Sequence, residues 1–391
     1  MADVDVLIVG AGAAGAACAE ALRAGDFGGS ILLAGRDVDP PYERPYCSKQ
    51  YLCGDVSREQ TYLGLPDGLD LRTRTSVMKL DTGARTAKLG KDELSFGHAV
   101  LATGANVRRL RVDGAQLEGI HYLRALGNAD AIRADAADAE RVVLVGGSYI
   151  ACEVAASLTA LGKACTLVMQ EEGPLSLGFG RTAGEFFAGV LREHGIDWVA
   201  SDALGRFEGD ERVQRVVTES GRVIEADLVV MGTGAVPDVM LARSAGLELG
   251  ETGGIACSSR LEASAPDLWA AGDACEYESV VHGRRLRIEH WEVARAQGAA
   301  VAAQIMGSRE PFAEIPYFWS DLADWCTLEY VGPAGEWDRE VVRGSTDAGE
   351  FTIFYLSSGR VVAALTVGRS GDLDRARELM ASGETVDPDT L

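Results

Sequence analysis

The sequence has few features of a metalloprotein, a membrane protein or a nucleic-acid-binding protein. Its eight cysteines form no Cys-X-X-Cys pair and show no Cys/His spacing of a zinc site, so we expect no metal centre. No run of about 18 apolar residues is present, so we expect no membrane span. The net charge of −22 argues against nucleic acid and anionic membrane surfaces as partners. Without these signals, and without a basic segment before the first apolar run, a cytoplasmic location is expected.

The length predicts more than one domain. A chain of 391 residues exceeds what one hydrophobic core usually organises, so two or three domains are expected. The apolar content of 47% is ordinary for a globular protein.

The chain opens with a pattern typical of a dinucleotide-binding site. The apolar run Val6–Val9 is followed by a glycine-rich turn and the Ala-rich segment Ala16–Ala24, which predicts a strand, a tight turn and a helix. Gly10 permits the turn, Gly12 lets the backbone approach a pyrophosphate, and Gly15 lets the helix pack close to the strand. The helix N-terminus would then offer its N–H groups to the phosphates.

The segment after this turn carries an acid and two cations. A second strand is predicted at Ser30–Ala34, and Asp37 follows it at a distance suited to a ribose hydroxyl. Arg44 and Lys49 lie in the next, proline-rich loop, where they could contact phosphates or an electron-rich ring. The alternative is that both are ordinary cations of a solvated loop.

The sequence repeats its own opening near residue 141. A strand, a turn at Gly146–Ala151 and a helix at Cys152–Leu161 precede another strand at Cys165–Met169, which predicts a second dinucleotide site. The repeat is imperfect, because Ser148 and Ala151 replace the second and third glycines.

The end of this second unit lacks the usual acid. Met169 and Gln170 stand where an acid would bind the ribose, and Gln170 could still hydrogen-bond a hydroxyl. Glu171 and Glu172 come next, with no Arg or Lys from Gln170 to Gly173, so a 2′-phosphate would be repelled. The pattern favours NADH over NADPH.

The remaining elements fit around these two units. Three strands that end in Gly-containing turns are expected, of which His98–Gly104 and Asp227–Gly234 would return to the first domain, and a small α/β cap is expected after about residue 308. The corresponding segments are His98–Gly104, Asp227–Gly234 and Asp267–Asp273 for the strands, Glu292–Ile305 for a long helix, and Thr327–Tyr330, Arg339–Arg343, Glu350–Leu356, Val361–Val367 and Leu373–Met380 for the cap.

The order of these motifs resembles the two-dinucleotide flavoprotein superfamily to which glutathione reductase belongs. Four stretches are similar to the ferredoxin reductases of oxygenase systems, a branch that includes putidaredoxin reductase, rubredoxin reductases and apoptosis-inducing factor: Pro41–Lys49, Gly146–Ile150, Glu289–Trp291 and Pro316–Asp321. The resemblance spans about residues 4–335. It implies an α/β fold with two Rossmann-like domains, an FAD domain (1–107 and 227–310) and an NAD(H) domain (108–226), and a C-terminal α/β domain (311–391).

The resemblance also implies site residues. Lys49, Tyr149, Glu153 and Trp319 would be catalytic, with Lys49 and Trp319 by the flavin, and Tyr149 and Glu153 by the nicotinamide. Arg36 stands where the family often has an acid. The implied cofactor-binding residues are Gly10, Gly12, Gly15, Arg36, Asp37, Arg44, Lys49, Thr103, Gly104, Gly146, Gly147, Ser148, Tyr149, Ile150, Glu153, Gln170, Gly234, Asp273, Glu289, His290, Trp291 and Trp319.

These features imply an FAD-dependent reductase that takes hydride from NADH and passes single electrons to a small iron–sulfur protein, a ferredoxin or rubredoxin, of an oxygenase or P450 system. The protein would be a monomer or homodimer. An acidic ferredoxin would need a local basic surface, offered by Arg108, Arg109 and Arg111 or by Arg284, Arg285 and Arg287.

Several alternatives stay open. Trp291 and Trp319 could be plain core aromatics, and Tyr149 could simply pack at a helix start. Cys47 could serve a flavin oxidase or a thiol-dependent reductase, although its spacing from Cys53 differs from that of redox-active disulfides. The imperfect second turn also suits an FAD-binding sensor or partner-binding protein with a weak nicotinamide site.

Overall fold

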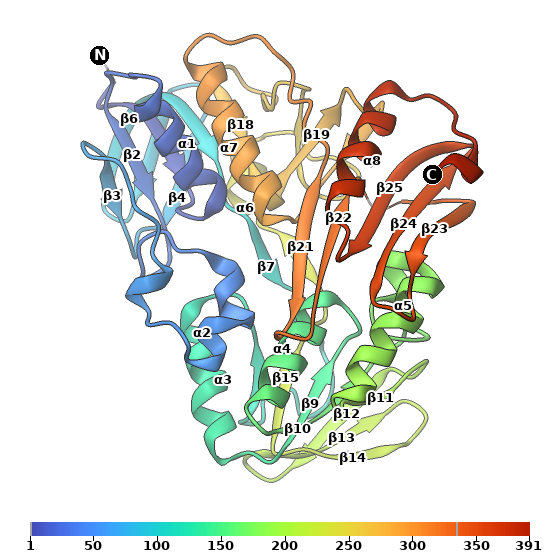
Figure 1. Ribbon diagram of the computed structural model, residues 1–391. Helices are drawn as coiled ribbons and strands as arrows, with labels where there is room; N and C mark the ends of the chain where they lie inside the picture. The colour runs from blue at the N-terminus through green and yellow to red at the C-terminus, as the bar shows by residue number, and fades with distance from the viewer. Residues whose placement is uncertain (1, 334) are drawn as a thin grey trace. The chain divides into compact units, whose positions relative to one another are not determined.

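The protein is described by a computed structural model over residues 2–333 and 335–391 (Figure 1). The chain divides into two compact units, each built from several segments. Unit 1 comprises Met1–Arg44, Thr61–Asn106 and Val236–Phe318, and unit 2 comprises Pro45–Gln60, Val107–Ala235 and Trp319–Leu391. The domain boundaries expected from the sequence stay a prediction.

Unit 1 is organised by a sheet with the strand order β3-β2-β1-β6-β5-β4, to which β18 is added beside β6. The five strands β1, β2, β3, β6 and β18 run parallel, and β1 is almost wholly apolar because both faces of a parallel sheet are covered. The bounds are β1 Val4–Val9, β2 Ile31–Ala34, β3 Asp70–Arg72, β4 Val77–Asp81, β5 Thr86–Leu89, β6 Asp92–Leu101 and β18 Leu268–Ala270.

Two small-residue helices pack together against this sheet. α1 (Ala13–Ala24) and α7 (Trp291–Ile305) lie side by side in Figure 1. The approach is close because Gly298 has no side chain: a Cβ there would lie 2.1 Å from the carbonyl oxygen of Ala14. Unit 1 also contains α6 (Met240–Ser244) and a small sheet of β17 (Ile255–Cys257), β19 (Cys275–Ser279) and β20 (Arg284–Leu286).

Unit 2 contains a second parallel sheet, with the order β11-β10-β9-β15-β8. Val143, Val168 and Val229 of this sheet form part of a buried core. The bounds are β8 Ile120–Tyr122, β9 Arg141–Val145, β10 Ala164–Val168, β11 Asp197–Val199 and β15 Leu228–Met231, with α2 Gln50–Cys53, α3 Leu126–Asp138, α4 Tyr149–Ala160 and α5 Ser176–Glu193 as its helices.

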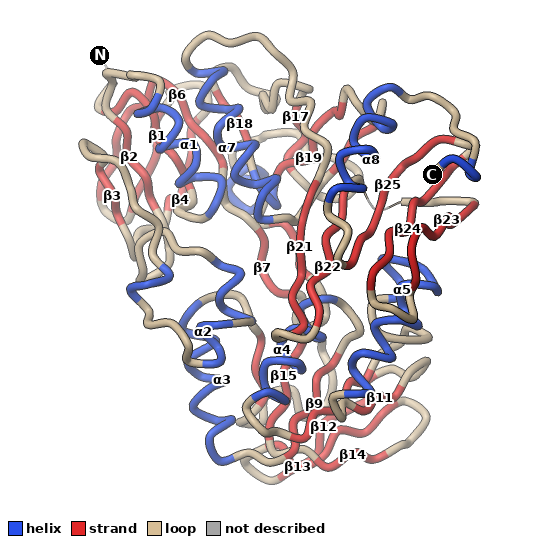
Figure 2. Tube along the Cα trace, viewed as in Figure 1, coloured by secondary structure: helices blue, strands red, loops and turns tan. Residues whose placement is uncertain are grey.

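Unit 2 also holds two antiparallel sheets, which Figure 2 shows as separate groups of strands. The C-terminal sheet has the order β21-β22-β25-β24-β23 and packs against α8. The bounds are β12 Leu204–Gly209, β13 Val213–Thr218 and β14 Val223–Glu225 for one sheet, and β21 Tyr317–Leu322, β22 Cys326–Val331, β23 Arg339–Ser345, β24 Glu350–Ser357, β25 Arg360–Val367 and α8 Gly371–Ser382 for the other. The short strands β7 (Ala105–Val107) and β16 (Ala235–Pro237) pair with each other.

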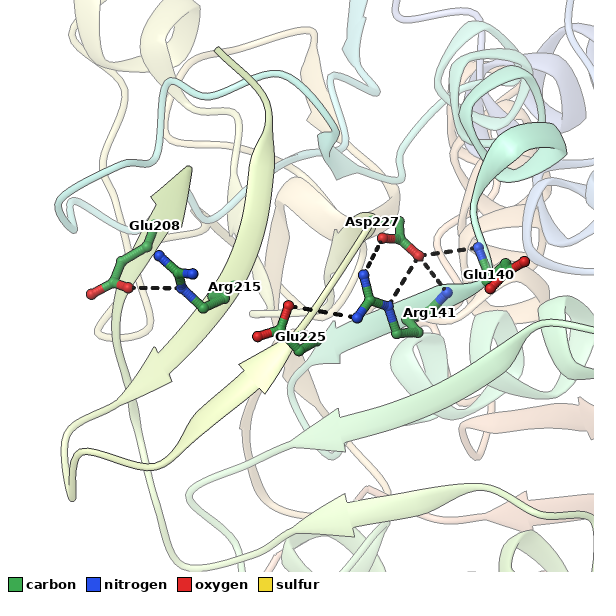
Figure 3. A network of polar contacts seen from close by, with 6 residues as sticks. All are labelled: Glu140, Arg141, Glu208, Arg215, Glu225 and Asp227. Carbon is green, nitrogen blue, oxygen red and sulfur yellow. Dashed lines mark hydrogen bonds and ion pairs between the residues drawn. The ribbon is translucent and has the colours of Figure 1, made fainter. Parts of the chain in front are cut away.

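An ionic network ties the edge of the second sheet together. Asp227 accepts hydrogen bonds from the backbone N–H groups of Glu140 and Arg141 and forms an ion pair of 2.6 Å with the Arg141 guanidinium (Figure 3). Arg141 also reaches Glu225, while Glu208 and Arg215 form a separate pair nearby. The hydrogen bonds from Arg141 outweigh partial burial and lower the pKa of Asp227 to about 2.

Two sequence expectations differ from the structure. The strand expected to return to the first domain, β15, instead pairs with β9 and β8 in unit 2, so that expectation was wrong. The helix expected from Cys152 begins at Tyr149, because Ser148 already takes the extended N-cap conformation. Residues Gln50–Cys53, which follow the proline-rich loop, form one helical turn that ends at Gly54 in the left-handed conformation.

No helix within the described ranges is long and apolar enough to cross a bilayer. Among the same residues, no group of three or more His, Cys, Asp or Glu side chains could hold a metal ion.

Candidate functional site

The first glycine-rich turn has the geometry that a bound diphosphate requires. Gly10 has a φ of 116°, and a Cβ at Gly15 would lie only 1.9 Å from the Gly10 carbonyl oxygen, so both positions need glycine. A Cβ at Gly12 would meet no protein atom within 4 Å, so this side of the turn is open. Gly12 is also the N-cap of α1 and provides no side-chain cap, and the first turn of α1 has no acidic residue. These features fit an anionic group at the helix N-terminus.

The loop after β2 places Asp37 between two polar neighbours. The Tyr42 hydroxyl donates a hydrogen bond of 3.2 Å to Asp37 Oδ2, and Arg44 Nη2 lies 3.3 Å from the same oxygen.

Arg36, the residue before Asp37, instead pairs with Asp238 at 2.9 Å. The Thr103 hydroxyl donates to the Asp238 carbonyl, and the Asp238 N–H donates to Gly104, so Thr103 and Gly104 hold the partner of Arg36.

The second group of candidate residues in unit 1 surrounds the start of α7. His290 is its N-cap, Trp291 is its first residue, and the His290 ring lies 4.4 Å from that of Phe318. His290 Nδ1 is buried without a hydrogen-bond partner in the described part of the chain. Burial lowers the pKa of His290 to about 4, and the charge of Asp273 only partly opposes this. A buried, neutral imidazole with an unused nitrogen fits a missing polar ligand at this end of unit 1.

Asp273 and Glu289 are held by one arginine. Arg287 Nη1 donates to the Asp273 carbonyl at 3.2 Å and to the Glu289 carboxylate at 2.5 Å. Asp273 follows Gly272, whose N–H donates to the side chain of the buried Gln297. Arg287 and Gln297 therefore fix the backbone that carries Asp273.

The second glycine-rich turn, in unit 2, keeps its shape despite its substitutions. Gly146 has a φ of 123°, and Ser148 is the N-cap of α4 without a side-chain capping bond. Gly232 faces Ala151, and a Cβ built on Gly232 would lie only 2.8 Å from the Ala151 methyl. The Ala151 methyl therefore fits because Gly232 has no side chain. Gly232 thus compensates for the loss of the third glycine. The predicted residues Tyr149 and Ile150 open α4, which has no acidic residue in its first turn.

The most deeply buried polar cluster of unit 2 is centred on Glu153. Its Oε1 lies 2.7 Å from Lys49 Nζ, and the two side chains are only 3% and 10% exposed. Ser320 donates to Oε1 at 2.6 Å, and Ser48 donates to Oε2 at 2.5 Å. The carboxylate therefore has one cation and two hydroxyl donors, which satisfies a buried charge.

Three separate chain segments build this cluster. Lys49 and Ser48 precede α2, Glu153 lies on α4, and Ser320 lies on β21. The Ser157 hydroxyl, one turn beyond Glu153, donates to the Ser48 carbonyl at 2.7 Å and fixes the segment that carries Lys49. Trp319 is next to Ser320, and Lys49 Nζ lies 5.7 Å from its ring centroid, within reach of a cation–π contact. The structure thus brings together three of the four predicted catalytic residues.

The thiol alternative at Cys47 stays a prediction. All eight cysteines have free thiols, Cys47 is buried, and the Cys53 thiol contacts the Ser157 carbonyl oxygen at 3.9 Å. Burial raises the pKa of Cys53, which disfavours the thiolate needed for thiol chemistry.

Sequence reasoning found the charged members of the cluster but assigned no role to the serines. Ser48 and Ser320 both lie inside stretches that resemble ferredoxin reductases, next to the predicted residues Lys49 and Trp319. That adjacency was the signal that could have marked the two serines as candidates. Two other predicted residues lie outside the cluster: Gln170 is exposed at the end of β10, and the Gly234 carbonyl accepts from the Arg108 N–H.

Comparison with known proteins agrees with this architecture. Residues 4–298 match the family described as pyridine nucleotide-disulphide oxidoreductase, and residues 317–391 match the family described as reductase C-terminal. The chain is 34% identical over 401 residues to the ferredoxin reductase subunit of 5,5′-dehydrodivanillate O-demethylase from Sphingobium sp., covering 100% of this chain and 96% of the relative. It is 32% identical over 393 residues to rhodocoxin reductase from Rhodococcus erythropolis, covering 99% and 91%.

The same branch appears among solved structures. The crystal structure of the covalent putidaredoxin reductase–putidaredoxin complex matches with a TM-score of 0.93 and 32% identity, covering 100% of this chain and 96% of that chain. The match covers both units and the C-terminal sheet. The chain belongs to the pyridine nucleotide-disulphide oxidoreductase family, in the branch of ferredoxin reductases.

Proposed function

We propose that this protein is an FAD-dependent reductase that oxidises NADH and reduces a small iron–sulfur protein, a ferredoxin or rubredoxin, of an oxygenase or P450 system. The observation that carries the proposal is the buried Lys49–Glu153 pair with Trp319 beside it, in a chain whose relatives are ferredoxin reductases of oxygenase systems. A cytoplasmic location and a monomeric or dimeric state stay predictions.

The protein binds FAD and a nicotinamide dinucleotide, as its family does. The turn at Gly10–Gly15, Asp37, Asp273 and His290 are proposed to hold FAD in unit 1. The open side of Gly12 and the unpartnered Nδ1 of His290 support this assignment. FAD supplies the conversion of a two-electron donor into single electrons. The turn at Gly146–Ala151 is proposed to hold the nicotinamide dinucleotide in unit 2.

The Glu153 cluster is proposed to set the position and orientation of Lys49. A cation held in place by an ion pair stabilises negative charge that develops on a neighbouring reduced group. Ser48 and Ser320 hold the carboxylate so that Lys49 points consistently. The Trp319 ring, with its centroid 5.7 Å from Lys49 Nζ, adds a cation–π contact to this arrangement. Tyr149 is proposed to contact the nicotinamide from the start of α4.

NADH is the proposed donor rather than NADPH. The segment after β10 carries Glu171 and Glu172 and no cation, so a 2′-phosphate would meet negative charge and no arginine. Gln170, exposed at this point, was the ribose contact expected from the sequence and stays a prediction.

The proposed docking surface for an acidic iron–sulfur protein is the basic group Arg108, Arg109 and Arg111. These three residues are exposed, and no ion pair to them is found among the residues that the structure describes. The alternative group is less suitable, because Arg285 and Arg287 already pair with Glu278 and Glu289. Complementary charge at such a surface accelerates encounter and makes it salt-dependent.

An anaerobic titration of the purified holoenzyme tests the reductive half of this function. NADH is expected to bleach the flavin band with one equivalent, and NADPH is expected to react much more slowly. Bleaching by dithionite but by neither nucleotide would reject the proposed donor and favour the sensor alternative. A Cys47→Ser variant with unchanged NADH oxidation would reject the thiol alternative.

A further inference from the structure

The second dinucleotide unit has no acid directly after β10. Met169 is buried at the first position after β10, so its side chain offers the ribose no hydrogen-bond acceptor of useful strength. The two glutamates that follow differ, since Glu171 is half-buried and Glu172 is exposed.

The loops after β2 and β10 have the same backbone hydrogen bonds. In unit 1, the Gly35 N–H donates to the Arg72 carbonyl oxygen at 2.9 Å. The Arg74 N–H donates to the Asp37 carbonyl oxygen at 2.9 Å, and the Thr75 N–H donates to the Gly35 carbonyl oxygen at 2.8 Å. In unit 2, the Met169 N–H donates to the Val199 carbonyl oxygen at 2.9 Å. The Ser201 N–H donates to the Glu171 carbonyl oxygen at 2.9 Å, and the Asp202 N–H donates to the Met169 carbonyl oxygen at 3.0 Å. Arg74 and Ser201 also share a left-handed φ, of 50° and 53°.

This correspondence pairs Asp37 with Glu171. Each lies three positions after the last residue of its strand, Ala34 or Val168, and each accepts a backbone hydrogen bond from the facing loop. Because Asp37 is the predicted ribose acid of the first unit, Glu171 occupies the same place in the second.

The Glu171 side chain is directed at the glycine-rich turn. A Cβ built on Gly147 would lie 3.2 Å from Glu171 Oε2 and 2.9 Å from Met169 Sδ. The Leu175 N–H donates to the Gly147 carbonyl at 2.8 Å, which holds the loop that follows Glu171 against the turn. Burial raises the pKa of the Cys152 thiol, at the start of α4, and the charges of Glu153 and Glu171 add to this effect.

We infer that Glu171, and not Gln170, binds the adenosine ribose of the nicotinamide dinucleotide and excludes its 2′-phosphate. The carboxylate accepts hydrogen bonds from the ribose 2′- and 3′-hydroxyls of NADH. A 2′-phosphate at the same place meets a fixed negative charge 3.2 Å from the Gly147 Cβ position. The inference rests on the proposed function, since it assigns a specificity-determining residue to that nucleotide site.

Calorimetric titration of the holoenzyme with ADP-ribose and with its 2′-phosphate tests this assignment without turnover. Glu171→Gln is expected to weaken ADP-ribose binding about tenfold, because it removes an ionic acceptor, and to reduce discrimination against the 2′-phosphate. Glu172→Gln, which removes the same charge one residue later, is expected to change affinity less than about twofold. In turnover, Glu171→Gln is expected to raise KM for NADH with kcat retained.

The outcomes separate this inference from the proposed function. Tight binding of ADP-ribose to the wild-type protein and to Glu171→Gln alike overturns the role of Glu171 while leaving the nucleotide site intact. Loss of affinity in Gln170→Ala but not in Glu171→Gln overturns it in favour of the amide. If the wild-type protein binds neither compound, both the inference and the proposed nucleotide site are wrong.

Discussion

Lys49 Nζ lies 2.7 Å from Glu153 Oε1, and the two charged side chains are buried together. The pair joins a loop residue to a helix residue more than a hundred positions away in the sequence. A buried ion pair contributes little net stability by itself, but removing one partner leaves an uncompensated charge. The position of Lys49 therefore depends on Glu153.

Glu153→Gln tests this dependence. The variant leaves the Lys49 ammonium buried without a counter-charge, at a cost of about 3 kcal/mol, and we expect the thermal midpoint of the holoenzyme to fall by about 5 °C or more. Glu278→Gln is the matched control, because its ion pair with Arg285 lies at the surface and contributes less than about 1 kcal/mol. Equal shifts in the two variants would show that Glu153 has no special structural role.

Ser320→Ala tests whether the C-terminal sheet positions the carboxylate. The variant removes a fully buried hydroxyl that donates to Glu153 Oε1, so Lys49 and its partner should become less ordered. We expect the rate of flavin reduction by NADH in stopped-flow experiments to fall about fivefold, with little change in NADH affinity. Ser279→Ala, which removes a buried hydroxyl that contacts His282, should lower stability alone. A reduction rate unchanged by Ser320→Ala contradicts the positioning role.

Gly232→Ala tests the compensation at the second turn. The added methyl would lie 2.8 Å from the Ala151 methyl, so either α4 or the turn must move. We expect NADH binding to weaken about tenfold or more, and the double variant Gly232→Ala/Ala151→Gly to recover much of it. Gly189→Ala, at an open position, is the control. Unchanged NADH affinity in Gly232→Ala would mean that the contact does not shape the site.

Asp227→Asn is expected to lower the free energy of unfolding at neutral pH, and to lower it less as the pH falls. The folded-state pKa of Asp227 is lowered from 3.8 to about 2, so its contribution is complete well above pH 3.8 and is lost as the pH falls through about 2. We expect the variant to be about 1–2 kcal/mol less stable than the wild type at pH 7, after allowance for partial exposure. In urea unfolding, about half of this difference should disappear at pH 3. The same difference at both pH values would rule out the ionic origin.

The parts of the site that the sequence predicted are those encoded locally. The turn at Gly10–Gly15 was recognisable because strand, turn and helix are consecutive and each glycine has a separate steric purpose. Glu153 was recognisable as a candidate because it is a charge in an apolar helix. Its partners Ser48 and Ser320 were not, because they meet it only through tertiary packing.

One error of placement has a clear physical origin. The strand at Leu228–Met231 has the same apolar pattern as any buried parallel strand, so its sequence does not say which of two sheets it joins. The proposed ribose acid Glu171 lies just after the expected positions Met169 and Gln170, and it is the shared hydrogen-bond pattern of the two loops that aligns it with Asp37. The loop geometry, and not the residue count, decides which side chain reaches the turn.

The central claim is that the protein carries electrons from NADH to an iron–sulfur protein. The most direct measurement is the anaerobic reduction of a purified [2Fe–2S] ferredoxin by NADH with catalytic amounts of the holoenzyme, followed at the visible band of the cluster. Our account predicts reduction far above that given by free FAD, with a KM for ferredoxin that rises with ionic strength. Full reduction of the flavin by NADH, with ferredoxin reduced no faster than by free FAD, would contradict it.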